Sequence, residues 1–163
     1  MSANRPSCAR CSLARDADDR CSGSAGGCSL GTGRWLALQQ HDVDGFAELT
    51  GDLQWVHIDV ERAGRRPFGS TIVHGYFTFS LLPKASIEIY GVTGFGVGLN
   101  YGLNRVRFPA SLPVGGEFRL GVELHEVRSV PGGGVEYITR NTFELRGSSK
   151  PACMADWIVR GYP

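Results

Sequence analysis

The segment GSTIVHGYFTFSLLPKASIEIY, residues 69–90, is the most apolar long stretch of this 163-residue chain. From Tyr76 to Leu82 it is apolar on nearly every side of a helix, interrupted only by Thr78 and Ser80. A helix of that kind belongs at the centre of a fold. Pro83 removes a backbone donor and bends a helix axis. The segment therefore predicts a buried helix that begins near Gly75 and is kinked or broken around Pro83.

The sequence after Gly91 is typical of β-structure. In EFRLGVELHEV, residues 117–127, apolar side chains recur at every second position. The stretch GVEYITRNTFELRG, residues 134–147, alternates too, with one parity formed by Val135, Tyr137, Thr139, Asn141, Phe143 and Leu145. The turns between them contain Gly and Pro, as in SVPGGG and GSSKP. Strands joined by short turns predict an antiparallel meander, and strands that follow helices indicate an α+β protein. We therefore expect a single hot-dog domain, in which an antiparallel sheet wraps around the central buried helix.

The segment before the central helix predicts shorter helices. HDVDGFAELTG, residues 41–51, has Val43, Phe46 and Ala47 on one helical face. Gly51 is suited to end this helix in a left-handed cap. HIDVERAG, residues 57–64, predicts another short helical turn. Asp52 is thereby placed just after a helix end, at the start of a loop.

Composition excludes several classes of partner. The formal net charge is +1, without a basic block, which argues against a nucleic-acid partner. No apolar run reaches the roughly 18 residues that a membrane span needs, so we expect no membrane association. Residues 1–33 contain only three large apolar residues, Met1, Leu13 and Leu30, so they do not resemble a secretory signal. We expect a cytoplasmic protein.

Four of the five cysteines lie in the first 28 residues, two of them in the C-x2-C pair CARC, residues 8–11. A zinc site is one interpretation, but a second pair with zinc-type spacing is missing. Disulfides are unfavourable in a reducing compartment. The composition, rich in Ser, Gly, Ala and Arg, favours a disordered or non-family tail over residues 1–30. The hot-dog domain is then expected over residues 31–163.

The candidate catalytic pair is Asp52 and His57. A carboxylate and an imidazole that converge can hold a water molecule and remove its proton. The alternative is a helix-capping Asp and a surface His, which the spacing alone does not exclude. Metal binding by Asp52, His57, Asp59 and His74 is a third interpretation, but the spacing matches no known metal motif, so we expect no metal. Ser70 and Ser80 lack a nucleophile motif, and Cys153 is expected to be a packed thiol.

Gly75 offers a different kind of chemistry. The first N–H groups of a helix have no partner within the helix, and they lie at its positive end. Such groups suit a carbonyl oxygen that gains negative charge during a reaction. Gly also lets a ligand approach the backbone closely. An ordinary helix start is the alternative.

The stretch TGDLQWVHIDVERAGRRPFGSTIVHGY resembles the hydratase motif of MaoC-like dehydratases, the family of (R)-specific enoyl-CoA hydratases. Ten positions match in register: Gly51, Asp52, His57, Asp59, Ala63, Phe68, Gly69, Ile72, His74 and Gly75. Gln54-Trp55 replaces the usual Asn-Pro, which together with NYGLNRVRFP and KPACMADWIVR is similar to the branch named after nodulation protein N. The resemblance covers about residues 31–161 and implies a hot-dog fold.

The resemblance also implies a function. Asp52 and His57 would activate the water, Gly75 would bind the thioester carbonyl oxygen, and His74, Trp55 and Tyr76 would form the surrounding substrate site. The expected enzyme is a hydro-lyase that hydrates trans-2-enoyl thioesters to (R)-3-hydroxyacyl thioesters. It would need no cofactor, because coenzyme A, or acyl carrier protein, is part of the substrate. Family members commonly form homodimers. A hot-dog thioesterase and a non-catalytic acyl-binding module remain alternatives.

Overall fold

The computed structural model describes residues 11–13, 27–67 and 69–163. Its elements follow in the order β1 (Cys11–Leu13), β2 (Cys28–Thr32), β3 (Leu36–Ala37), α1 (Gln40–Thr50), α2 (Trp55–Ile58), α3 (Val60–Gly64), α4 (Gly75–Ser80), α5 (Leu82–Ser86), β4 (Tyr90–Val92), β5 (Val97–Arg107), β6 (Glu117–Val130), β7 (Gly134–Leu145) and β8 (Cys153–Tyr162). Among these described residues, no helix combines the length and the apolarity needed to cross a bilayer.

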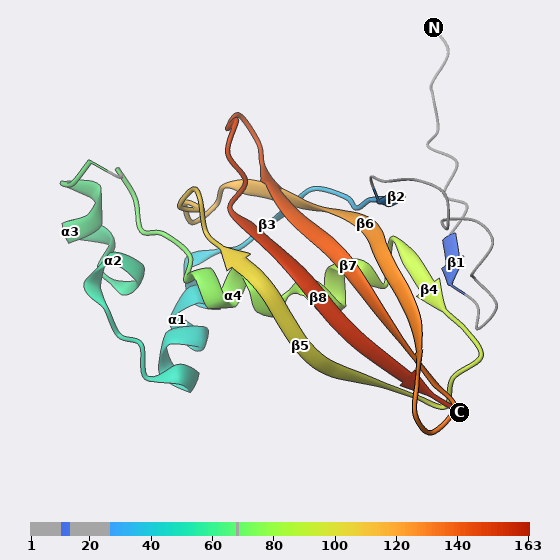
Figure 1. Ribbon diagram of the computed structural model, residues 1–163. Helices are drawn as coiled ribbons and strands as arrows, with labels where there is room; N and C mark the ends of the chain where they lie inside the picture. Colours follow the sequence, from blue (N-terminus) through green and yellow to red (C-terminus); the bar gives the residue numbers. More distant parts are fainter. Residues whose placement is uncertain (1–10, 14–26, 68) are drawn as a thin grey trace, which may run out of the picture.

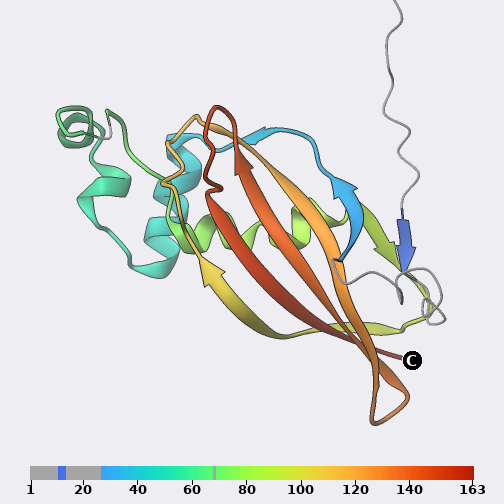
Figure 2. The same cartoon turned by 45° about the horizontal axis from the view of Figure 1, so that its top comes forward.

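The main sheet is antiparallel and has the strand order β2-β6-β7-β8-β5, with β3 also paired to β6. It curves around α4 and α5, as Figures 1 and 2 show. This is the predicted hot-dog arrangement of an α+β protein. The predicted meander is correct for β6, β7 and β8 but wrong for β5, which pairs with β8 rather than with its sequence neighbour β6. As a result β5 is an edge strand.

The core lies between the concave face of the sheet and the central helices. The alternating residues of β6 and β7 face inward as predicted, and they pack with residues of α5 and β8; the buried set includes Phe118, Leu120, Val122, Leu124, Phe143, Leu82, Ala85, Cys153, Trp157 and Val159. Burial on this scale is the main favourable term in folding. The twofold periodicity of the strands therefore determines which face wraps the helix.

The central helix is broken, as its sequence predicts. α4 ends at Ser80, and α5 begins at Leu82 with Pro83 in its first turn. Pro83 has no N–H to continue the hydrogen bonding of α4, so the chain starts a second short helix instead. The prediction of a helix buried on all sides was wrong at Tyr76, whose side chain is 74% exposed. Tyr76 lies in the first turn of α4, next to the N-cap residue His74.

α1 lies near the start of α4 at one end of the sheet, and α2 and α3 lie further out at the same end (Figure 1). Gly51 adopts φ 75° and its N–H donates to the Ala47 carbonyl at 2.8 Å, so the predicted left-handed cap of α1 is confirmed. β2 begins at Cys28 and pairs with β6, a few residues ahead of the predicted domain start. Cys8 and Cys21 of the predicted tail lie outside the described residues.

Candidate active site

Asp52 is held at the mouth of the site by the end of α1. The chain reverses at Gly51, and Asp52 follows at the first position of the loop. Its side chain is 54% exposed, so the carboxylate can reach solvent and a bound molecule. The helix end fixes the backbone of this residue while its side chain stays accessible.

His57 is presented by α2, a helix of 4 residues, and its ring is buried. Its Nδ1 lies 2.7 Å from the backbone carbonyl oxygen of Ile72. A carbonyl oxygen can only accept, so Nδ1 carries the proton and Nε2 of the neutral ring is left as an acceptor. The backbone of His57 is also held, because Gln40 Nε2 donates to its carbonyl at 2.8 Å. The imidazole is therefore fixed in orientation with a bare nitrogen available.

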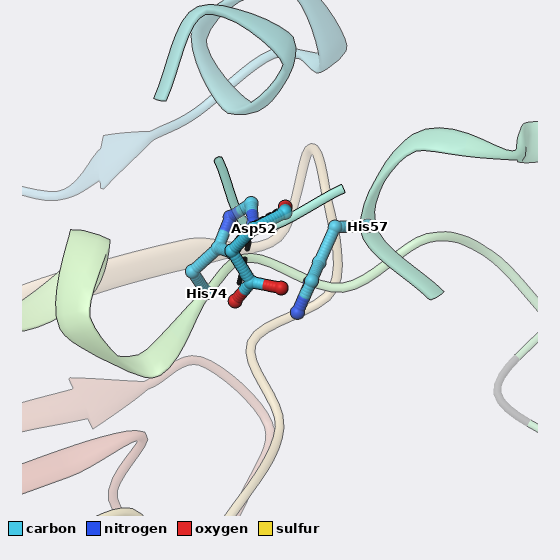
Figure 3. A group of neighbouring side chains, drawn as sticks. All are labelled: Asp52, His57 and His74. Carbon is cyan, nitrogen blue, oxygen red and sulfur yellow. Dashed lines mark hydrogen bonds and ion pairs between the residues drawn. The ribbon is translucent and has the colours of Figure 1, made fainter. Parts of the chain in front are cut away.

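His74 completes the group from the N-cap position of α4. One ligand-type atom from each of Asp52, His57 and His74 lies within 4.8 Å of the others. The Nε2 of His74 is 3.1 Å from the backbone oxygen of Asp52 and 3.9 Å from its Oδ2. Figure 3 shows the three side chains turned toward one another. The structure thus brings together residues that are up to 22 positions apart in the sequence.

Gly75 begins α4 directly after His74. The first helical hydrogen bond that follows is Thr78 N–H to the His74 carbonyl, at 3.0 Å. The N–H groups of the first turn have no acceptor within the helix. A Cβ on Gly75 would meet the ring of Phe108 at 3.0 Å, so no larger residue fits without displacing that ring. The close packing of Phe108 against the backbone therefore favours glycine at this position.

Trp55 begins α2, the helix that holds His57, and Tyr76 follows Gly75 in α4. The guanidinium of Arg62 lies over the Trp55 ring at 4.3 Å from its centroid, which orients the indole. Tyr76 makes an edge-to-face contact with Phe108, with ring centroids 5.9 Å apart and planes at 75°. The exposed Tyr76 ring and the half-exposed Phe108 ring together border the start of α4.

The proposed metal ligands do not all meet. Asp59 lies outside the group, because its Oδ1 accepts the Arg62 N–H at 2.9 Å and caps α3. His57 and His74 are stacked, with centroids 3.7 Å apart and planes at 25°. Asp52, His57 and His74 still offer one ligand-type atom each within 4.8 Å of the others, which is close enough for a metal ion. The absence of a metal therefore stays a prediction.

Cys153 is a packed thiol, as expected. It is fully buried in β8, and burial raises the pKa of its thiol to about 12. A thiol with that pKa supplies almost no thiolate near neutral pH. Nucleophilic chemistry at Cys153 is therefore unfavourable.

Three residues near the group were not identified from the sequence as site residues. Phe46 was read only as part of the apolar face of α1, yet its ring contacts His74 with centroids 5.1 Å apart. Gln40 holds the His57 backbone, and Phe108 covers Gly75. Of these, only Phe108 carried a usable signal, because it belongs to the stretch NYGLNRVRFP that supported the family resemblance.

Comparisons with known proteins agree with this geometry. Residues 23–144 match the model of the family described as MaoC like domain. The chain belongs to this family. It is 45% identical over 137 residues to 3-hydroxyacyl-thioester dehydratase Z of Mycobacterium tuberculosis (strain ATCC 25618 / H37Rv), covering 84% of this chain and 91% of that protein.

A second relative and a solved structure extend the comparison. Nodulation protein N of Rhizobium leguminosarum bv. viciae is 35% identical over 135 residues, which cover 82% of this chain and 84% of that protein. The R-hydratase PhaJ1 from Pseudomonas aeruginosa, in its unliganded form, superimposes with a TM-score of 0.63 at 20% identity. That match covers 86% of this chain and 84% of the other, and it shows that the hot-dog fold is shared.

Proposed function

We propose that this MaoC-like protein is an (R)-specific enoyl-CoA hydratase. It adds water across the trans-2 double bond of an enoyl thioester and catalyses the reverse dehydration of the 3-hydroxyacyl thioester. The observation that carries the proposal is the convergence of the Asp52 carboxylate and the His57 imidazole beside the start of α4. The 45% identity to a 3-hydroxyacyl-thioester dehydratase supports the same reaction.

Asp52 and His57 divide the handling of one water molecule. The carboxylate oxygen and the bare Nε2 of His57 are both acceptors, so a water between them donates both of its hydrogens. The lone pair of the water oxygen is then free to attack C3 of the enoyl group. Asp52 removes the proton as the C–O bond forms, with His57 orienting the water and sharing the transfer.

Gly75 acts at the carbonyl end of the substrate. Attack at C3 moves electron density through the conjugated system onto the thioester oxygen. The Gly75 N–H at the start of α4 would donate to that oxygen as its charge grows. The proton taken from the water then returns to C2, the carbonyl re-forms, and Asp52 and His57 end in their original states. Proton, hydroxyl and electron pair are thus all accounted for.

Trp55 and Tyr76 would line the path of the thioester next to these groups. Both are aromatic, one oriented by Arg62 and the other largely exposed beside Phe108. Their exposed surface suits the apolar parts of an acyl thioester. His74 was also expected to bind substrate, but its side chain is 3% exposed. It would therefore support the site through its contact with Asp52 rather than by touching the substrate.

The reaction needs no bound cofactor, because coenzyme A or acyl carrier protein arrives as part of the substrate. The division into a tail over residues 1–30 and a domain over residues 31–163 stays a prediction. So does the cytoplasmic location, which cell fractionation can check.

We propose that the active form is a homodimer. β5 is an edge strand whose apolar side chains Leu99, Tyr101 and Leu103 are exposed by 49%, 56% and 43%. An unpaired edge with such a surface is a template for pairing with another chain. A cleft of about 380 Å³ between β5 and the ends of α4 and α5 adds to this surface. Light scattering on the purified protein should give twice the chain mass, and a monomer mass would contradict the proposal.

A spectrophotometric assay with crotonyl-CoA tests the hydratase function. We expect loss of the enoyl absorbance, and a fall in kcat of about 10²–10⁴ for both Asp52→Asn and His57→Ala, since each removes acid–base assistance. Asp59→Asn is the matched control, because Asp59 caps α3 outside the group and Asn caps equally well. Its kcat should stay near the wild-type value.

The same assay separates the alternatives. A thioesterase would release a free thiol from the acyl-CoA instead of consuming the double bond. An acyl-binding module would bind crotonyl-CoA without turnover. Normal hydration by the doubly substituted protein would rule out Asp52 and His57 as the catalytic pair.

A further inference from the structure

His74 is placed as a supporting residue behind the reacting groups. It stands at the N-cap of α4 and is almost completely buried. Its Nε2 lies 3.1 Å from the backbone oxygen of Asp52, and its Nδ1 has no hydrogen-bond partner among the described residues. A side chain so enclosed has little surface to offer to a substrate.

These contacts determine where the proton of His74 resides. The Asp52 carbonyl oxygen can only accept, so Nε2 must carry the hydrogen. The neutral ring then has its bare nitrogen at Nδ1. His74 is therefore a fixed donor to the backbone that carries the Asp52 carboxylate.

A second set of contacts connects His74 to His57. The rings of Phe77, Phe46, His74 and His57 follow one another in contact, and we call them the aromatic column. Phe77 and Phe46 stack with centroids 4.7 Å apart and planes at 9°, Phe46 and His74 are 5.1 Å apart, and His74 and His57 are 3.7 Å apart. The column draws rings from α4, α1 and α2 and ends on the catalytic imidazole.

The column and the hydrogen bond to Ile72 restrain different motions of His57. Stacking on His74 fixes the plane of the ring, and the Nδ1–H bond to the Ile72 oxygen fixes its rotation within that plane. His74 thus touches both members of the pair at once, Asp52 through its backbone and His57 through its ring face. Catalytic groups must be held within roughly 0.5 Å of their productive geometry to be effective.

We propose that His74 is the positioning residue of the site, which sets the distance between the Asp52 carboxylate and the His57 imidazole without contacting substrate. This role rests on the proposed hydratase function. It assigns two separable tasks to one side chain, a hydrogen-bond donor toward Asp52 and a stacking surface toward His57. Misplacement of a catalytic group by about 1 Å can cost on the order of 10²-fold in rate.

Two substitutions separate the tasks. His74→Phe keeps an aromatic ring in the column but loses the donor to Asp52. His74→Gln keeps a donor that can reach Nε2's position but loses the ring. We expect each to lower kcat for crotonyl-CoA about 10- to 100-fold while KM stays within about twofold, because only the reacting geometry is disturbed. A rise in KM with unchanged kcat would show that His74 contacts the substrate and would overturn the proposal.

A double-mutant cycle distinguishes positioning from a general structural role. Once Asp52→Asn has removed the carboxylate, adding His74→Phe should cause little further loss of kcat, because the donor acts through Asp52. Multiplicative losses would overturn the proposal. The function itself is tested separately, since it fails if the wild-type chain does not hydrate crotonyl-CoA, whatever the His74 variants do.

A measurement on the wild-type protein covers the case in which His74 variants do not fold. Nitrogen-15 NMR of the histidine rings should find His74 with its hydrogen on Nε2 and His57 with its hydrogen on Nδ1. Hydrogen on Nδ1 of His74 would contradict the donor role toward Asp52.

Phe46→Leu removes the ring next to His74 and tests the aromatic column. It should lower kcat several-fold with KM unchanged, and an unchanged kcat would contradict the role of the column.

Discussion

The helices between residues 40 and 80 and the sheet beside them are stabilised in different ways. α2, α3 and α4 have 4, 5 and 6 residues and are too short to be stable alone. Side chains hold them, as with Gln40 on the His57 backbone and the rings of the aromatic column. β6, β7 and β8 instead have 14, 12 and 10 residues, paired along their backbones and backed by the core.

This difference separates function from stability. In the helical region the side chains that orient the catalytic residues are also the ones that hold the short helices in place. In the sheet most side chains contribute burial, and none of the candidate catalytic residues lies there. Changes in the helical region should therefore lower kcat, while changes in the sheet should lower the free energy of unfolding and leave the rate of the folded enzyme nearly unaffected.

Among substitutions in the sheet, Phe143→Ala should cause the largest loss in the free energy of unfolding. Phe143 is fully buried in β7, with its ring centroid 6.1 Å from that of Phe118. Removing such a ring leaves a cavity and costs about 3–5 kcal/mol. Denaturant unfolding measures that loss, and kcat per folded molecule should stay close to the wild-type value.

Ile87→Ala provides the control for Phe143→Ala. Ile87 is apolar but 67% exposed, so its loss should change the free energy of unfolding by no more than about 0.5 kcal/mol. If Phe143→Ala lowered kcat of the folded enzyme as strongly as Asp52→Asn does, the separation between scaffold and site would not hold.

Local sequence patterns predicted the parts of the fold that depend on periodicity. The alternation in residues 117–127 identified the inner face of β6, and Gly51 identified the end of α1, because both signals reside in neighbouring residues. The pairing of β5 with β8 was not predicted, because its partners, from Arg107 with Met154 to Val97 with Tyr162, are far apart in the sequence and no local pattern specifies them. Topology of this kind depends on the whole chain.

The site was predictable only as far as the family motif reached. Asp52, His57 and Gly75 are motif positions, and the structure brings all three to one end of α4. Phe46 and Gln40 come from α1, outside the motif, where they read as ordinary helix residues. Their contribution arises from tertiary contacts, which a single sequence does not reveal.

A group of charged side chains pairs across the outer face of the sheet. Glu136 of β7 is directed away from the core, yet its side chain is fully covered by Arg128 and Arg160 of the neighbouring strands. Arg160 Nε donates to Oε2 at 2.7 Å and Arg128 Nε to Oε1 at 2.8 Å, and Arg160 also lies over the Tyr101 ring of β5. Glu136 thereby connects four strands.

Glu136→Gln should have a smaller effect than Phe143→Ala, and one that depends on pH. Burial alone would raise the pKa of Glu136, but the hydrogen bonds from Arg160 and then Arg128 outweigh it and hold the pKa below its usual value. A lowered pKa means that the carboxylate stabilises the fold above the unfolded-state pKa, about 4.3. This stabilisation is lost as the pH falls through the lower, folded-state pKa.

Thermal unfolding of wild type and Glu136→Gln across a pH series measures this contribution. The variant should melt a few degrees lower at pH 7, and the gap should close in acid, because wild-type Glu136 is then protonated and resembles Gln. kcat should match wild type at pH 7, since the ion pairs lie on the outer face of the sheet. A gap that persisted unchanged into acid would mean that shape rather than charge matters at Glu136. A drop in kcat would mean that the outer face of the sheet influences the active site through β7 and β8.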